Sequence, residues 1–161
     1  MYSAGILPFT IINKEIHILL GRERYDKSYS DFGGKYDKND SCVLQTALRE
    51  FKEETMYDNI DLSFLINNCC TNYTESRTLK GNIYYMFLIY FDLNQLKSIT
   101  NNFKNKLENT RECEKDDIII IKMTDLLGQL IKFKKKFIHL RKVFENTMIL
   151  NYNFFHTFQD Y

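Results

Sequence analysis

Four charged residues recur at helical spacing in the first half of the chain: Arg49, Glu50, Glu53 and Glu54. In a helix over residues 41–57, the three acidic side chains lie on one arc beside an apolar stripe. Carboxylates three and four residues apart repel one another unless a positive charge lies between them. A hard cation such as Mg2+ or Mn2+ takes oxygen ligands of this kind. The spacing therefore indicates a divalent metal site, with a solvated acidic face as the ordinary alternative.

Two adjacent glycines, Gly33 and Gly34, come shortly before this predicted helix. Glycine allows the backbone to approach a ligand closely. The acids also lie next to the apolar stripe and not opposite it, which places them near the body of the protein. Both features favour the metal site over the solvated face.

Residues 33–57 resemble a Nudix box. The pattern of that family is a glycine, five residues, a glutamate, seven residues and then R-E-U-x-E-E-x-G-U, where U is apolar. Here Gly34 is followed by five residues and Asp40, and the segment from Arg49 to Glu54, with Phe51 apolar, fills R-E-U-x-E-E. A motif with this many fixed positions is far more specific than a lone glycine pattern.

The sequence departs from the family pattern at three points. Asp40 stands for the glutamate, eight residues separate it from Arg49, and Met56 replaces the glycine of the box. Aligned on Arg49, the glutamate position falls on Ser41. We expect Asp40 or Ser41 to be the N-cap of the helix, although Asp40 also remains a candidate for catalysis. Without the glycine, the helix is expected to continue to about Asn59.

The resemblance implies a Nudix-type α/β/α sandwich with a mixed sheet. It also implies hydrolysis of a pyrophosphate bond in a nucleoside diphosphate linked to another moiety. The implied cofactor is Mg2+ or Mn2+, held by the Gly34 carbonyl, Glu50, Glu53 and Glu54. In this scheme Glu53 is a ligand or the catalytic base, and Arg49 orients the acids through a one-turn pair with Glu53.

A further acid is expected near the metal, because many Nudix enzymes place a glutamate in a loop before a late strand. Glu114 is our choice by its distance to the predicted strand, and Glu112 is the other main candidate. Glu108 and Asp116 are more distant alternatives. The ordinary alternative for each of these residues is an acid in a solvent-exposed loop with no role in catalysis.

The segment before the box is expected to face the substrate. Arg22, Arg24 and Lys35 are candidates for binding phosphate oxygens, which guanidinium groups bind in bidentate fashion. Tyr25 and Phe32 are candidates for stacking on a base. The alternatives are an ion pair within an exposed loop for the arginines and a place in the core for Phe32.

Length and composition agree with one folded unit. We assign residues 1–161 to a single Nudix domain with a C-terminal helical extension over about 124–161. The 22 Lys+Arg nearly balance the 21 Asp+Glu, so the overall charge does not direct the protein to nucleic acid or membrane. The four cysteines lack metal-finger spacing, and no signal peptide or membrane span is predicted. We therefore expect a cytoplasmic protein with reduced thiols. Abundant Asn, Ile and Lys suggest an AT-rich genome, such as that of a large DNA virus.

The remaining chain predicts alternating strands and helices. Strands are expected at 3–12, 16–21, 62–66, 69–73, 77–80, 83–91 and 118–123, a helix at 93–103, a polar loop at 101–114, and one or two helices from 124 onward. Pro8 should place the first strand at an edge or a bulge. Basic residues accompany the expected C-terminal helix: Lys132, Lys135, Lys136, His139 and Lys142. They form either a solvated face or a surface that contacts RNA.

Three functions remain open for this sequence. The first is a nucleotide pyrophosphatase, and the second is an mRNA decapping enzyme that releases m7GDP from capped RNA. The third is a catalytically impaired Nudix-like module that binds nucleotides. The intact acids Glu50, Glu53 and Glu54 argue against the third, and the sequence leaves the oligomeric state open.

Overall fold

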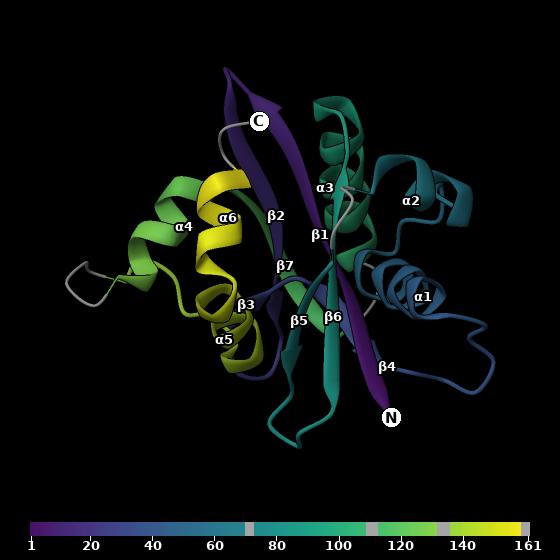
Figure 1. Cartoon of the computed structure of the whole chain (residues 1–161). Coiled ribbons are helices and arrows are strands. Elements are labelled where there is room, and N and C mark those ends of the chain that lie inside the picture. Colours follow the sequence, from purple (N-terminus) through teal and green to yellow (C-terminus); the bar gives the residue numbers. More distant parts are fainter. Residues whose placement is uncertain (70–72, 109–112, 132–135, 159–161) are drawn as a thin grey trace.

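A mixed sheet forms the middle layer of the protein (Figure 1). The computed structural model describes residues 1–69, 73–108, 113–131 and 136–158. Within them the strands are β1 Tyr2–Ile12, β2 Glu15–Glu23, β3 Tyr29–Ser30, β4 Phe32–Lys35, β5 Thr74–Arg77, β6 Ile83–Tyr90 and β7 Lys115–Lys122. The strand order is β3-β2-β1-β6-β5, with β4 paired to β1 and β7 paired to β2. Only β1 and β6 are parallel among these pairs.

Two groups of helices cover the two faces of this sheet (Figure 1). One group contains α1 Val43–Thr55, α2 Leu62–Asn68 and α3 Leu93–Leu107. The other contains α4 Met123–Leu130, α5 Lys142–Leu150 and α6 Tyr152–Phe158. The expected α/β/α sandwich with a mixed sheet is thus confirmed.

Alternation along the strands builds a separate apolar core on each face. In β1, Leu7 and Phe9 face the core under α4, α5 and α6, whereas Ala4 and Ile6 face the core under α1, α2 and α3. Successive strand residues point to opposite faces, so a strand covered on both sides needs apolar residues at both parities. This burial explains the nearly continuous apolar run at the start of the chain.

The first strand is central, which corrects the expectation based on Pro8. One side of β1 pairs with β6 over Tyr2–Phe9, and the other pairs first with β4 and then with β2. Pro8 lies between those last two pairings, which involve residues 3–6 and 9–12. A break in the ladder at that point tolerates a residue without an N–H. The following turn has positive φ at Asn13 and Lys14, as a two-residue hairpin requires.

Two other expectations for the middle of the chain are wrong. Residues 62–68 are the helix α2, because the Asp61 side chain accepts a hydrogen bond from the Phe64 N–H and caps it. The apolar spacing there is too short to separate a buried strand from a helix. The segment expected as a polar loop from 101 is helical to Leu107, where α3 ends, and residues 109–112 lie outside the described part.

The expected basic C-terminal helix is also wrong. The helix α4 ends at Leu130, and residues 136–141 are not helical. Lys136 and Lys142 both pair with Glu145, at 2.7 and 3.3 Å, and do not form one free basic face. Lys132, Phe133 and Lys135 lie outside the described residues.

The helix α1 ends earlier than expected. It stops at Thr55, and Met56 adopts the left-handed conformation with φ 56°. A methionine therefore occupies the backbone conformation that glycine favours at the end of a helix. Its carbonyl accepts hydrogen bonds from the Asn102 amide and the Lys106 ammonium group on α3. These contacts hold the turn where the family glycine is missing. No described helix has the length and apolar character needed to cross a membrane.

Candidate active site

Glu50 lies directly against the second glycine of the β4 strand. A Cβ added to Gly34 would be 2.4 Å from the Glu50 carboxyl carbon and 2.4–2.5 Å from its two oxygens. No side chain fits between them, so the glycine allows the carboxylate of α1 to approach the backbone of β4. Burial raises the pKa of Glu50, and the nearby charges of Glu53 and Glu114 act in the same direction.

Arg49 holds the start of the box segment together. Its guanidinium group donates to Glu50 at 2.9 Å, to Glu53 at 3.2 Å, and to the Lys35 carbonyl at 2.8 Å. It also donates to both oxygens of Asp40, at 3.2 and 3.1 Å. Because the planar guanidinium group has five N–H donors, one residue can connect the strand, the loop and the helix. The expected one-turn pair with Glu53 is therefore present.

Asp40 is not the helix cap that we expected. The N-cap is Cys42, without a side-chain hydrogen bond, and Ser41 bonds instead to the Gln45 side chain. The buried Asp40 carboxylate accepts from Arg49 and from the Thr46 hydroxyl at 2.9 Å. The Arg49 guanidinium holds the pKa of Asp40 below its usual range. The extra residue of the loop is thus accommodated while an acid still bonds Arg49.

Glu54 points into the protein, beneath the glycines. Its Oε2 accepts from the Gly33 N–H at 2.8 Å, and its Oε1 lies 3.3 Å from the Lys115 ammonium nitrogen. Only 4% of the residue is exposed. Burial raises its pKa to about 8, although the positive charge of Lys115 opposes this effect. Glu54 is therefore a carboxyl group with too little positive charge around it.

A buried polar layer continues behind the glycines. Lys115 is fully buried and bonds Glu23 at 2.6 Å and the Ser30 hydroxyl at 2.9 Å. Asp31 accepts a short hydrogen bond from the Tyr84 hydroxyl, and burial raises the pKa of Asp31 to about 6. Such networks stabilise a protein only when every charge has partners.

A cleft of about 580 Å³ opens above this layer. Its lining includes Gly33, Gly34 and Lys35 from β4, Glu50 from α1, and Glu114 from the residue before β7. The turn between β5 and β6 and the start of α5 complete the lining, with Asp31 and Tyr84 among the buried residues that it reaches. The volume lies within the range of about 300–1,000 Å³ that is usual for small-molecule sites.

The cleft brings together some of the predicted site residues and not others. Gly34, Lys35, Glu50 and Glu114 line it. Glu53 does not, and 58% of its side chain is exposed. Glu114 is itself exposed, and its backbone carbonyl accepts from the Arg24 N–H.

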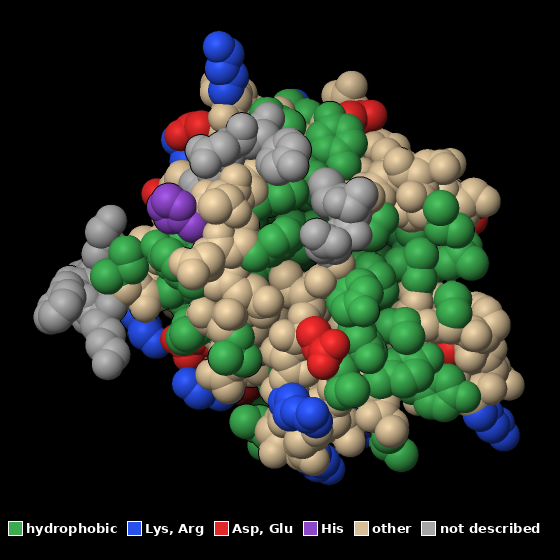
Figure 2. Space-filling view, in the orientation of Figure 1, with side chains coloured by type: hydrophobic (Ala, Val, Ile, Leu, Met, Phe, Trp, Pro, Cys, Tyr) green, Lys and Arg blue, Asp and Glu red, His purple; other side chains and the backbone are tan. Residues whose placement is uncertain are grey.

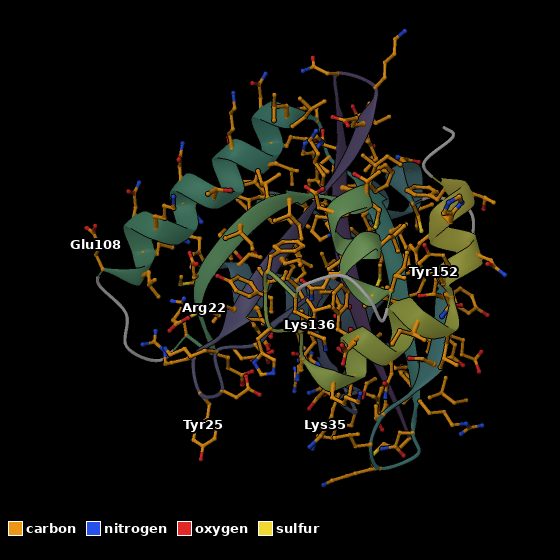
Figure 3. The ribbon with its side chains drawn as sticks, turned by 90° about the vertical axis from the view of Figure 1, so that its left-hand side faces the viewer. Arg22, Tyr25, Lys35, Glu108, Lys136 and Tyr152 are labelled. Carbon is orange, nitrogen blue, oxygen red and sulfur yellow. The ribbon has the colours of Figure 1, made fainter. Side chains whose placement is uncertain are left out.

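The other predicted substrate contacts lie away from the cleft. Arg22 pairs with Asp116 at 2.8 Å, and the Arg24 side chain donates to the Cys113 carbonyl at 2.9 Å. Tyr25 is fully exposed and points away from the body of the protein (Figure 3). Phe32 is fully buried against Phe51, so it has no exposed face on which a base could stack. Its expected role in stacking is corrected to one in the core.

The other candidate loop acids do not line the cleft, or they belong to residues that the structure does not describe. Glu108 follows α3 and lies at the far end of that helix in Figure 3. Asp116 pairs with Arg22 and with Lys27. Glu112 belongs to the residues that the structure does not describe. Among the described candidates, Glu114 is the one that lines the cleft.

Several residues of the site could not be recognised from the sequence. Lys115 starts a strand beside two aspartates, and such a position suggests an exposed charge. Arg141 stands before α5, far from the box in sequence, yet its guanidinium group donates to Glu23 at 2.9 Å. Glu23 and Tyr84 belong to strands whose pairing brings them to the glycines. Long-range pairing creates these neighbours, and local spacing does not show it.

The donor set suits a hard divalent cation, although the side chains are not gathered around one point. Among the described residues, no three Asp, Glu, His or Cys side chains are close enough to hold a metal ion. Glu50 and Glu53 bond Arg49 instead, and Glu54 bonds Gly33 and Lys115. Burial raises the pKa values of Glu50 and Glu54 despite their contacts with Arg49 and Lys115, so a further positive charge would favour their ionised forms. Oxygen donors short of positive charge are what Mg2+ or Mn2+ binds well.

The contact between Gly34 and Glu50 gives a direct prediction. In Gly34→Ala, the new methyl group must displace the Glu50 carboxylate, because the two would be 2.4–2.5 Å apart. We expect the hydrolysis that the resemblance to the Nudix box implies to slow by roughly ten- to a hundredfold. The unfolding free energy should change by less than about 1 kcal/mol, because a side-chain end can move. Enzyme kinetics and urea unfolding check the two parts. Unchanged activity in a folded variant would contradict the prediction.

The comparisons with known proteins were made on sequence and on structure. No protein-family model matches the sequence. Over 58 aligned residues the chain is 40% identical to Uncharacterized protein L534 of Acanthamoeba polyphaga mimivirus, and the match covers 33% of this chain and 19% of that protein. The chain thus matches about a fifth of the length of this relative.

Solved structures give much broader coverage. A mutT/nudix family protein from Listeria innocua has a TM-score of 0.58 at 17% identity, covering 99% of this chain and 94% of that one. The NUDIX domain of Shewanella oneidensis NrtR, complexed with ADP ribose, has a TM-score of 0.57 at 16% identity and coverages of 98% and 88%. A C. elegans Ap4A hydrolase has a TM-score of 0.54 at 17% identity and coverages of 78% and 83%.

The sheet, its two helical layers and these likenesses define a protein with the Nudix fold. Within that fold, α1 carries the charged residues of the box, and the glycines of β4 lie against it. At sequence identities of 16–17%, the likeness to these structures establishes a shared fold and does not establish a shared activity.

Proposed function

We propose that this protein is a Nudix-type hydrolase that cleaves a pyrophosphate bond in a nucleoside diphosphate linked to another moiety. One observation carries the proposal: the carboxylate of Glu50 lies on Gly34 at the edge of a cleft of about 580 Å³. A phosphate bound in that cleft would meet the box residues. On this proposal, residues 1–161 form one Nudix domain, in which the segment from 124 onward helps to close the cleft.

The proposed cofactor is Mg2+ or Mn2+. Glu50, Glu54 and the Gly34 carbonyl would hold it, with Glu114 as an additional acid and Glu53 as a more distant one. The bound ion would neutralise phosphate charge and activate water. Arg49 would keep Glu50 oriented, because its guanidinium group bonds this carboxylate and the Lys35 carbonyl together.

The substrate classes are suggested by the structural relatives. The NrtR domain is complexed with ADP ribose, and another relative is an Ap4A hydrolase. Capped RNA is a weaker candidate, because residues 136–141, the described part of the expected basic helix, are not helical. A module that only binds nucleotides remains the non-catalytic alternative. The mimivirus relative agrees with the compositional suggestion of a viral source, and a cytoplasmic location remains a prediction.

A metal-dependent activity assay tests the proposal. The protein is incubated with ADP-ribose, Ap4A, dNTPs and capped RNA, each with Mg2+ or Mn2+ and again with EDTA. We expect turnover of small nucleotides that EDTA abolishes and added metal restores. Release of m7GDP from capped RNA alone would establish decapping instead. Ligand binding without turnover of any substrate would favour the binding module.

A further inference from the structure

Charged residues from different elements line the cleft. Glu50 and Glu114 lie beside β4 and α1, and we call this part the acidic end, although Lys35 of β4 also lines it. The turn between β5 and β6 and the start of α5 contribute Lys80, Arg141 and Lys142, and the cleft is also lined by Asp26 and Asp31. In Figure 1, β4 and α1 lie on one side of β6, and α5 lies on the other. We call these three cations the basic wall.

The cations of the basic wall have donors available for a ligand. Lys80 is exposed and has no hydrogen bond or ion pair with any described residue. Lys142 is exposed, and its contact is a 3.3 Å pair with Glu145 on its own helix. Exposed pairs of this type contribute little and exchange readily for another anion. Figure 2 shows Lys and Arg side chains in blue at the lower edge of the molecule, around the β5–β6 turn.

Arg141 is held in place more firmly. One nitrogen of its guanidinium group donates to Glu23 at 2.9 Å, and Glu23 also bonds the buried Lys115. The Arg141 N–H of the backbone donates to the Tyr29 carbonyl at 2.9 Å, which fixes the start of α5. Since 47% of the side chain is exposed and a guanidinium group has five N–H donors, donors remain on the cleft side. An arginine fixed at one nitrogen is well prepared to bind an anion with the others.

A diphosphate cut at the acidic end accounts for Glu50 but not for the basic wall. Cations that other elements bring to the same cleft suit further negative charge on the substrate. We propose that the basic wall binds an additional phosphate, so that the preferred substrates are nucleoside polyphosphates with at least three phosphates. A diphosphate joined to an uncharged sugar would leave the wall unoccupied. This inference rests on the proposed function, because it takes the acidic end as the place of cleavage.

Binding of two uncleavable analogues tests the inference apart from turnover. Adenosine 5′-(α,β-methylene)triphosphate and adenosine 5′-(α,β-methylene)diphosphate differ by one phosphate. Their dissociation constants are measured by calorimetry for the full chain and for Lys80→Gln, Lys142→Gln and Lys97→Gln. Lys97 is an exposed lysine on the outer side of α3 and serves as the control with the same charge change.

We expect the unsubstituted protein to bind the triphosphate analogue more tightly. Lys80→Gln and Lys142→Gln should each weaken that binding by roughly three- to tenfold. They should leave the diphosphate analogue within about twofold, because a single exposed charge acts weakly at a distance in salt. Lys97→Gln should change neither constant. Equal affinity for both analogues, or equal losses with both, would overturn the inference.

The same measurements separate this inference from the proposed hydrolysis. Turnover of nucleotides with Mg2+, but without preference for the triphosphate analogue, would leave the hydrolase standing and remove the role of the wall. Preference for the triphosphate analogue without turnover of any nucleotide would support the role of the basic wall and contradict the proposed hydrolysis. Both variants replace exposed side chains, so unfolding does not explain a loss of binding.

Discussion

Lys115→Met is expected to destabilise the protein by about 3–5 kcal/mol, because it removes the cation of a buried ion-pair network in which only Glu23 keeps a second cation, Arg141, among the described contacts. Lys115 is fully buried and bonds Glu23 at 2.6 Å and Glu54 at 3.3 Å. Total stabilities of proteins are about 5–15 kcal/mol, so the loss would be a large fraction. Urea unfolding followed by circular dichroism measures it.

The pH dependence of this loss distinguishes its cause from simple repacking. Burial raises the pKa of Glu54 from 4.5 to about 8, so the folded protein keeps this carboxyl protonated where the unfolded chain has lost the proton. The stability that a raised pKa supplies is complete below about pH 4.5 and is lost as the pH rises through about 8. Loss of Lys115 would raise the pKa of Glu54 further, so the deficit of Lys115→Met should stay nearly constant from pH 5 to pH 7 and widen as the pH rises through about 8.

Two further variants complete this experiment. Adding Glu54→Gln to Lys115→Met should recover part of the lost stability, because it removes one of the unpaired charges. Lys122→Met, on the exposed end of the same strand, should leave the unfolding midpoint nearly unchanged. An equal effect of the two lysine substitutions, or a deficit that does not change with pH, would contradict the role assigned to Lys115.

The arrangement of the charged residues on α1 could be predicted from the sequence, because it depends on spacing within one helix. Residues at helical spacing fixed which acids share α1, and Arg49 bonds Glu50 and Glu53 as one turn of helix allows. Apolar runs likewise predicted the first hairpin, whose second strand alternates, and β6, which is apolar throughout. Prediction failed where one-turn signals were ambiguous: residues 62–68 suit a strand or a helix until the Asp61 cap is seen.

The far side of the site could not be predicted, because tertiary pairing creates it. Lys115 reaches Glu54 only when β7 pairs with β2, and Arg141 reaches Glu23 when its backbone N–H bonds the Tyr29 carbonyl. The box therefore supplies a carboxylate face, and chain segments distant in sequence decide what lies opposite. Substrate preference depends on that second part, which explains why the motif alone left the substrate open.

The two box acids Glu50 and Glu53 should differ strongly when each is replaced by glutamine. Glu50 is half-buried, lies on Gly34 and lines the cleft, whereas Glu53 pairs with Arg49 and 58% of its side chain is exposed. A carboxylate that already lines the cleft can act on bound phosphate or its cation without a change in its position. We therefore expect Glu50→Gln to lower kcat by at least about a hundredfold and Glu53→Gln by less than about tenfold.

Both substitutions keep the size of the side chain and its bond to Arg49 through the remaining oxygen, so the comparison isolates the charge. Similar unfolding midpoints for the two variants would show that the fold is intact. Binding of Mn2+, followed by the relaxation of water protons, should weaken more in Glu50→Gln than in Glu53→Gln, because the former loses a proposed ligand that faces the cleft. If Glu53→Gln instead loses as much activity and metal affinity as Glu50→Gln, then Glu53 turns inward when metal binds. The cation, and not the metal-free packing around Arg49, would then determine the working arrangement of the box.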